Sequence, residues 1–218
     1  MVNKPDKEYA IVVKRMISEQ ILARGISDAR VIETMTSVPR HIFVDDALKS
    51  QAYTDAPLNI GEGQTISQPY IVALMTERLN LTGTEKVLEI GTGCGYQTTI
   101  LSRLVKQIYT IERIKTLALQ ARARFKMLGL RNVVLRIGDG SLGWKEAAPF
   151  DRILVACAAP IMPESLISQL SVGGFVVIPV ESSGGNQDLW KVTKTPDGLK
   201  KENLGPCRFV KLIGKQGY

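Results

Sequence analysis

The spacing of apolar residues predicts helices in the first third of the chain. Apolar positions recur at helical intervals over residues 7–24. A second helix is expected after Ser27, a residue typical of an N-cap, and Pro39 would close it. A third helix is expected to have Ser67 at its N-terminus. Residues 40–63 are rich in turn-forming residues, which predicts irregular structure between the second and third helices.

From residue 85 onward, short apolar strands alternate with helical segments, a pattern typical of a doubly wound, mostly parallel sheet. The turn-forming run at 196–198 is too short for a parallel crossover, so the sheet is expected to end in an antiparallel hairpin. The predicted fold class is α/β, with an N-terminal helical cap and substrate segment at 1–80 and a core at 81–218, together forming one compact unit. The predicted strands are 86–90, 107–111, 133–137, 152–156, 174–180, 187–193 and 208–213, and the predicted helices of this part are 96–105, 115–128 and 163–170.

The first of these strands runs into a glycine-rich segment. Gly91, Gly93 and Gly95 alternate with other residues, and glycine lets backbone approach a ligand closely because it has no Cβ and tolerates positive φ. The third glycine lies one residue too early for the dinucleotide fingerprint. Glu89, in the strand itself, would repel a phosphate and attract a cationic group. The loop therefore favours S-adenosylmethionine, whose amino group and sulfonium are positive.

Two carboxylates follow at the ends of the next two strands. Glu112 lies 21 residues after Gly91, the spacing at which a carboxylate accepts hydrogen bonds from ribose hydroxyls. Asp139 lies between Gly138 and Gly140, where it could accept a hydrogen bond from an adenine amine. Each carboxylate alone is also typical of a solvated strand end or a turn. Three successive strands with these endings indicate a nucleoside site. A seven-stranded, Rossmann-like sheet with a reversed C-terminal hairpin resembles the usual architecture of the class I methyltransferases.

Composition limits the alternatives. Of the residues, 44% are hydrophobic, and neither a membrane-length apolar run nor a secretory leader is apparent. Three cysteines without metal-type spacing predict reduced thiols in a cytoplasmic protein, with no metal site. The net charge of +7 permits nucleic-acid contact, but lysines and arginines on outer helix faces are usually a solvated surface. We expect a monomer that binds neither nucleic acid nor a membrane.

The chain resembles the protein-L-isoaspartate O-methyltransferases from about residue 16 to residue 213. The glycine loop is general to class I methyltransferases, whereas the segment GQTISQP at 63–69 is specific to this family. The matching segments are VPRHIFV (38–44), AYTDAPLNIGEGQTISQP (52–69), VLEIGTGCGYQT (87–98), IER (111–113), GDG (138–140), FDRILVACAAP (150–160), QLSVGGFVVIPV (169–180) and RFVKLIG (208–214).

This resemblance implies a repair enzyme that transfers a methyl group from S-adenosylmethionine to the free carboxylate of isoaspartyl residues in damaged proteins, after which a succinimide forms. The resemblance makes Ser67 the catalytic position, with residues 64–67 closing over the cofactor and substrate. Cys94, Cys157 and Lys211 depart from the family pattern, the last replacing a proline. The cofactor-binding residues expected from the loop, the strand ends and the resemblance are Gln64, Thr65, Ile66, Glu89, Gly91, Thr92, Gly93, Glu112, Arg113, Gly138, Asp139 and Gly140.

The expected chemistry explains why no catalytic histidine pair is present. A carboxylate nucleophile is already ionised at pH 7, so methyl transfer needs alignment and exclusion of water rather than a general base. The single histidine, His41, is interpreted as structural. Two alternatives remain: a nucleic-acid methyltransferase, although 155–160 lacks the Asn/Asp-Pro-Pro-aromatic motif, and a non-catalytic adaptor that uses the N-terminal helices as a binding surface.

Overall fold

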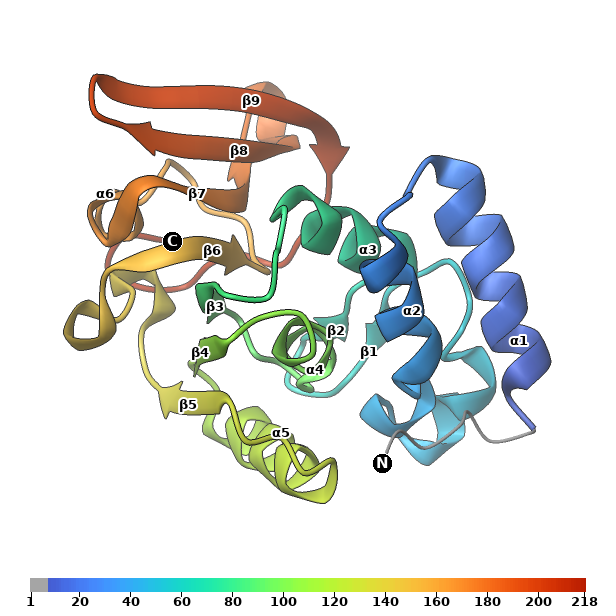
Figure 1. The fold of residues 1–218 in the computed structure, drawn as a ribbon. Coiled ribbons are helices and arrows are strands. Elements are labelled where there is room, and N and C mark those ends of the chain that lie inside the picture. Colours follow the sequence, from blue (N-terminus) through green and yellow to red (C-terminus); the bar gives the residue numbers. More distant parts are fainter. Residues whose placement is uncertain (1–7) are drawn as a thin grey trace.

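The computed structural model describes residues 8–218 and has a twisted seven-stranded sheet at its centre (Figure 1). The strand order is β5-β4-β3-β6-β7-β8-β9, parallel from β5 to β7 and antiparallel from β7 to β9. The predicted fold class is confirmed. The strands are β3 (Lys86–Ile90), β4 (Gln107–Glu112), β5 (Val133–Ile137), β6 (Phe150–Val155), β7 (Leu170–Glu181), β8 (Gln187–Thr195) and β9 (Gly198–Cys207).

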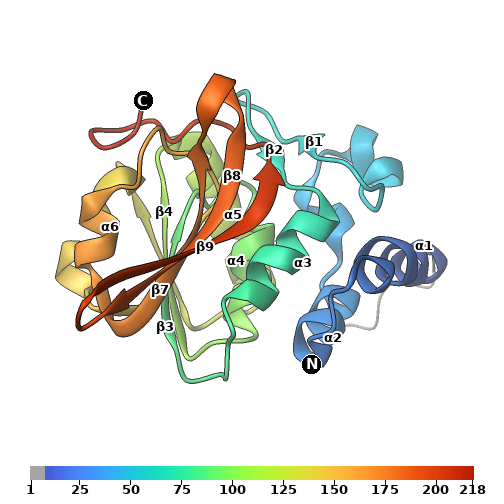
Figure 2. The same ribbon diagram turned by 90° about the horizontal axis from the view of Figure 1, so that it is seen from above.

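Helices cover both faces of this sheet. In the second view, α3 and α4 lie on one side and α6 on the other (Figure 2). Side chains of a strand alternate between faces, so Val87 packs into one apolar cluster and Leu88 into the other. None of the helices within residues 8–218 combines the length and hydropathy that a membrane span needs. The α-helices are α1 (Ala10–Arg15), α2 (Ala29–Ser37), α3 (Pro69–Arg78), α4 (Tyr96–Ser102), α5 (Lys115–Met127) and α6 (Glu164–Ser168).

The N-terminal part is helical and irregular in the places that the sequence predicts. α1 continues through a π-helical stretch, Met16–Ile21, and a 3-10 turn, Leu22–Arg24, which ends at Gly25 with a φ of 87°. Lys7, the first residue of the predicted helix, lies outside the described residues. The segment before α3 holds 3-10 turns at Arg40–Phe43 and Asp46–Gln51 and the small antiparallel pair β1 (Leu58–Asn59) and β2 (Thr65–Ile66); further 3-10 turns are Gly140–Leu142, Lys145–Ala147 and Ser183–Gly185.

The predicted strand at 208–213 is wrong, because the last strand is β9. β9 is largely exposed and carries lysines, as edge strands often do, so it has no apolar alternation to reveal it. Residues 208–213 instead leave the sheet edge and make one bridge, between Lys211 and Ala158. The buried Leu212 in this segment belongs to the apolar cluster that includes Ile90 of β3 and Ile111 of β4.

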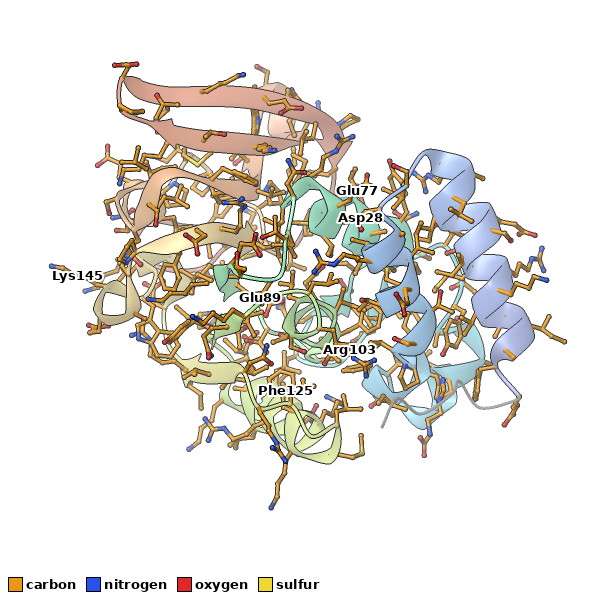
Figure 3. All side chains as sticks on the ribbon, in the orientation of Figure 1. Asp28, Glu77, Glu89, Arg103, Phe125 and Lys145 are labelled. Carbon is orange, nitrogen blue, oxygen red and sulfur yellow. The ribbon has the colours of Figure 1, made fainter. Side chains whose placement is uncertain are left out.

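The predicted N-cap of α2 is also wrong, by one residue. The Asp28 carboxylate accepts hydrogen bonds from the N–H groups of Arg30 (2.8 Å) and Val31 (3.2 Å), which makes Asp28 the cap. The N–H groups of Ser27 and Asp28 donate to Glu77 of α3, at 2.7 and 2.8 Å (Figure 3). The start of α2 is therefore joined to α3 by a side chain that lies 49 and 50 positions further along the chain.

We expect Asp28→Ala to lower the free energy of unfolding by about 1 kcal/mol, because two N–H groups at the start of α2 lose their acceptor. Ser27→Ala is the matched control, and we expect it to change stability little because its contact with Glu77 uses only the backbone. Urea denaturation of the three proteins measures both effects. Equal losses in the two variants would contradict the assignment of the cap to Asp28.

Candidate active site

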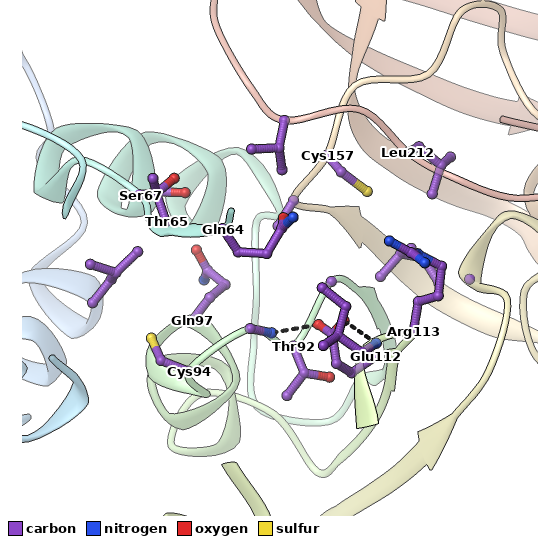
Figure 4. A pocket seen from close by; sticks show the side chains of 18 of the residues that line it. Gln64, Thr65, Ser67, Thr92, Cys94, Gln97, Glu112, Arg113, Cys157 and Leu212 are labelled. Carbon is purple, nitrogen blue, oxygen red and sulfur yellow. Dashed lines mark hydrogen bonds between the residues drawn. The ribbon is translucent and has the colours of Figure 1, made fainter. Parts of the chain in front are cut away.

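A pocket of about 110 Å³ opens at the carboxyl ends of β3 and β4, beside the segment that precedes α3 (Figure 4). The pocket is also lined by Ala156 and Cys157, which follow β6. The crossovers run in opposite directions on the two sides of the boundary between β3 and β6, and in α/β sheets ligands bind at such places. Ten of the predicted site residues line the pocket. They are Gln64, Thr65, Ile66, Ser67, Gly91, Thr92, Gly93, Glu112, Arg113 and Gly140.

The glycine loop is folded tightly between β3 and α4. Gly93 has a φ of 53° and turns its N–H toward Glu112. Gly95 has a φ of 89°, and a Cβ at this position would lie 2.6 Å from the Phe125 ring. A side chain at Gly95 would therefore push α5 away from the loop, which explains the need for glycine on packing as well as conformational grounds.

Glu112 holds the loop against the end of β4. Its carboxylate accepts hydrogen bonds from the N–H groups of Gly93 and Ile114, both at 2.8 Å, shown as dashed lines in Figure 4. Only 7% of the residue is exposed, and its side chain lines the pocket. A carboxylate has about four acceptor positions, so two remain for hydroxyl groups of a ligand.

Glu89 lies beneath the loop and does not line the pocket (Figure 3). It is fully buried, and one oxygen, Oε2, lies 2.5 Å from the Thr98 hydroxyl and 2.7 Å from the Thr110 hydroxyl. Burial raises the pKa of Glu89 to about 8, with a smaller contribution from the charge of Glu112, while the two hydroxyls oppose the shift. Thr110 also hydrogen-bonds Thr92 of the loop at 2.6 Å, so Glu89 supports the loop from below.

Asp139 and Gly138 are likewise absent from the pocket lining. The Asp139 carboxylate accepts hydrogen bonds from the N–H and hydroxyl of Ser141, at 2.9 and 2.6 Å, and from the N–H of Lys215 at 2.8 Å. Burial disfavours its ionisation, but these donors hold its pKa below the ordinary value. In this structure the Asp139 side chain secures the C-terminal segment next to the pocket, and its predicted contact with adenine stays a prediction.

Ser67 lies on the opposite wall of the pocket from the loop, directly after β2. The sequence predicted Ser67 at the N-terminus of α3, and this prediction is wrong by one residue. The helix begins at Pro69, and Gln68 occupies the cap position. Proline disfavours helical geometry in the residue before it, which delays the start of the helix by one residue. The Ser67 carbonyl accepts a 2.7 Å hydrogen bond from Arg40, which is fully buried.

The pocket is also lined by residues that were not predicted from the sequence to bind a ligand. Apolar ends of strands are ordinary core positions in a sequence, so nothing local distinguishes those that face a ligand. Lys211 lines the pocket, and its bridge uses the Val210 carbonyl and the Leu212 N–H, so its own N–H is not needed and a proline could replace it. The remaining lining residues are Val72, Ile90, Cys94, Tyr96, Gln97, Ile111, Ile114, Ala156, Cys157, Val210, Leu212 and Ile213.

Comparison with known proteins agrees with this geometry. The sequence profile of the protein-L-isoaspartate(D-aspartate) O-methyltransferase family matches residues 12–217. The chain belongs to this family. It is 56% identical over 211 residues to the protein-L-isoaspartate O-methyltransferase of Geobacter metallireducens, covering 96% of this chain and 97% of that one. It is 57% identical over 209 residues to that of Syntrophus aciditrophicus, covering 94% of each.

Solved structures extend the agreement to the fold. A protein-L-isoaspartate O-methyltransferase superposes with a TM-score of 0.85 at 28% identity, covering 94% of this chain and 67% of that one. The Plasmodium falciparum enzyme, solved with S-adenosyl-L-homocysteine, gives 0.80 at 27% identity, covering 94% and 98%. The resemblance stated from the sequence is confirmed, and with it the methyltransferase class, the repair function and the S-adenosylmethionine cofactor of the family.

The raised pKa of Glu89 predicts a pH-dependent stability. Between pH 4.5 and about pH 8 the folded protein keeps a proton on Glu89 that the unfolded chain has released. The stability that Glu89 contributes is thus complete below pH 4.5 and is lost as pH rises through about 8.

Glu89→Gln removes this titration and preserves the shape of the side chain. We expect the free energy of unfolding of the wild type to fall relative to the variant between about pH 5 and pH 8, by at most about 1.4 kcal/mol per pH unit. Urea denaturation at several pH values measures the difference. Parallel pH profiles for the two proteins would show that Glu89 is ionised in the folded state.

Proposed function

We propose that this protein transfers a methyl group from S-adenosylmethionine to the free carboxylate of isoaspartyl residues in damaged proteins, in the pocket between the glycine loop and residues 64–67. The observation that carries the proposal is that Ser67 and Glu112, from distant parts of the chain, line one cavity. Family membership supports the reaction, and this cavity supports the assignment of residues to it.

The pocket residues fit an adenosyl sulfonium. Ile90, Ile111 and Ile114 offer apolar surface to a purine, and the free acceptor positions of Glu112 suit the two hydroxyls of a ribose. Gly140 packs closely against Ile90 of the pocket wall, since a Cβ at this position would lie 2.4 Å from the Ile90 side chain. When bound, the cofactor supplies an electrophilic methyl group. The residues we assign to its binding are Gln64, Thr65, Ile66, Glu89, Gly91, Thr92, Gly93, Glu112, Arg113, Gly138, Asp139 and Gly140; among them Glu89 acts through Thr110 and Thr92, and Asp139 through the C-terminal segment.

The role of Ser67 is to position the acceptor. The isoaspartyl carboxylate is ionised at pH 7 and needs no base, so its oxygen has only to be aligned with the methyl group and shielded from water. The Ser67 hydroxyl can donate a hydrogen bond to the carboxylate oxygen that does not react. After transfer, the neighbouring backbone nitrogen can attack the ester carbonyl and expel methanol, which gives the succinimide without further help from the protein.

The proposal also covers the domain organisation, the cellular compartment and the oligomeric state. We assign residues 1–80 to a cap that contributes substrate contacts and residues 81–218 to the cofactor core. Three free cysteines, Cys94, Cys157 and Cys207, suit a reducing cytoplasm. We further propose that the protein acts as a monomer on isoaspartyl peptides and proteins and does not bind nucleic acid.

The direct test uses S-adenosylmethionine labelled on its methyl group. We expect the protein to label an isoaspartyl peptide and to leave its aspartyl twin and bulk RNA unlabelled. The aspartyl peptide is the matched control because it has the same composition and charge. Labelling of RNA alone would favour the nucleic-acid methyltransferase, and labelling of nothing, with the cofactor bound, would favour an adaptor.

We expect Ser67→Ala to lower kcat/KM for the isoaspartyl peptide by about 10- to 100-fold, the cost of a hydrogen bond to a charged group. Cofactor affinity, measured by calorimetry, should change less than about twofold, since Ser67 lies on the opposite wall from Glu112. Thermal stability should also stay unchanged because Ser67 does not cap α3. Ser168→Ala, on α6, is the control, and wild-type turnover in a folded Ser67→Ala protein removes Ser67 from the mechanism.

A further inference from the structure

Arg40 is a fully buried cation, and among residues 8–218 it has no carboxylate partner. It lies in the 3-10 turn Arg40–Phe43, and 0% of its surface is exposed. Within residues 8–218 the ion pairs at 4 Å or less join other residues, none of them Arg40. Burial lowers the pKa of Arg40, but a guanidinium starts so far above neutrality that it stays charged at pH 7.

The guanidinium is only partly compensated by its neighbours. Its Nε donates to the Ala52 carbonyl and its Nη2 to the Ser67 carbonyl, both at 2.7 Å. Its carbon lies 4.9 Å from the centre of the Tyr96 ring, within the range of a cation–π contact. Within the described residues, neither Nη1 nor the buried Tyr96 hydroxyl makes a hydrogen bond of normal geometry. The Tyr96 side chain nevertheless favours the charged guanidinium and opposes the effect of burial on the pKa of Arg40.

An isolated buried charge is unfavourable, and proteins retain one where it is paired or used. Carbonyl oxygens and a ring face supply partial negative charge, not a full anion. The pocket that shares Ser67 and Tyr96 with this arginine is, on the function proposed above, the place where the substrate brings a carboxylate. The substrate would therefore supply a negative charge that residues 8–218 do not provide beside this arginine.

We propose that Arg40 is a positioning residue for substrate binding, which fixes the Ser67 segment through the Ser67 carbonyl and supplies the positive charge that retains an anionic carboxylate in the pocket. Methylation converts that carboxylate to a neutral ester, so the same charge retains the substrate and does not retain the product. This inference rests on the proposed function. It adds a reason why the protein would bind its carboxylate substrate more tightly than its methyl ester product.

A charge that stabilises the bound carboxylate stabilises the ground state of the enzyme–substrate complex. Its removal should therefore be seen mainly in KM. The negative charge on the acceptor is lost as the methyl group arrives, so removing Arg40 should raise KM for the isoaspartyl peptide more than it lowers kcat. A merely structural arginine would instead lower stability and the fraction of active protein, with KM unchanged.

The test compares variants of Arg40 with variants of Arg152. Arg152 is a matched control because it also donates to two backbone carbonyls, those of Leu79 and Asp151 (2.8 Å each), and lies over an aromatic ring, that of Phe175 at 4.2 Å. It stands at the amino end of β6, away from the pocket. Steady-state kinetics with the isoaspartyl peptide would be run on Arg40→Lys, Arg40→Met, Arg152→Lys and Arg152→Met.

We expect Arg40→Met to raise KM by about tenfold or more with a smaller change in kcat, and Arg40→Lys to recover KM to within about threefold of the wild type. Both Arg152 variants should keep the wild-type KM. An unchanged KM in a folded Arg40→Met protein overturns the proposal, as does an equal rise in the Arg152 variants. A wild type that labels no isoaspartyl peptide overturns the proposed function instead.

A second measurement avoids the risk that Arg40→Met does not fold. Wild-type protein saturated with S-adenosylhomocysteine is titrated by calorimetry with the isoaspartyl peptide and with the same peptide carrying an uncharged carboxamide in place of the free carboxylate. We expect the acid to bind at least about tenfold more tightly, and Arg40→Lys to keep that preference. Equal affinities for the two peptides would contradict a charge that retains the anion.

Discussion

The hydrogen bonds that the Glu112 carboxylate accepts from Gly93 and Ile114 are the constraint on which the site depends. They tie the loop after β3 to the turn after β4, two strands whose parallel register already pairs Ile90 with Ile111. Because parallel neighbours end at one edge of the sheet, their loops meet there. The carboxylate fixes the distance between those loops and leaves acceptor positions facing the pocket.

Two buried ionisable groups on either side of this site behave differently. Glu89 can respond to burial by keeping a proton, and its raised pKa shows that response. Arg40 cannot lose its proton at neutral pH, so its charge persists behind Ser67. The buried group beneath the glycine loop is therefore neutral, and the buried group behind Ser67 is positive. This arrangement suits a cationic methyl donor on one wall of the pocket and an anionic acceptor on the other.

The two ends of the chain complete the enclosure. The N-terminal part supplies residues 64–67, which Arg40 holds through the Ser67 carbonyl, and the last residues supply 210–213. The C-terminal segment is held by Asp139, whose carboxylate accepts the Lys215 N–H, and by Ser141, whose hydroxyl accepts the Gln216 N–H at 3.0 Å. A pocket built from segments so distant in sequence exists only in the folded protein, which fits a reaction that requires water to be excluded.

Local patterns were sufficient for the parallel strands, the glycine loop and the Glu112 strand end, because each arises from residues adjacent in the chain. The Ser67 segment was identified by its resemblance to the family. Local patterns failed for β9, whose exposed edge has no apolar alternation, and for the start of α3, where Pro69 displaced the helix by one residue. The matching segment 38–44 contains Arg40, but no local pattern indicated its role, and none distinguished an Asp139 that holds the C-terminal segment from one that faces a ligand. Those roles depend on burial and on partners 27 and 76 residues away, and only tertiary packing brings such groups within hydrogen-bonding distance.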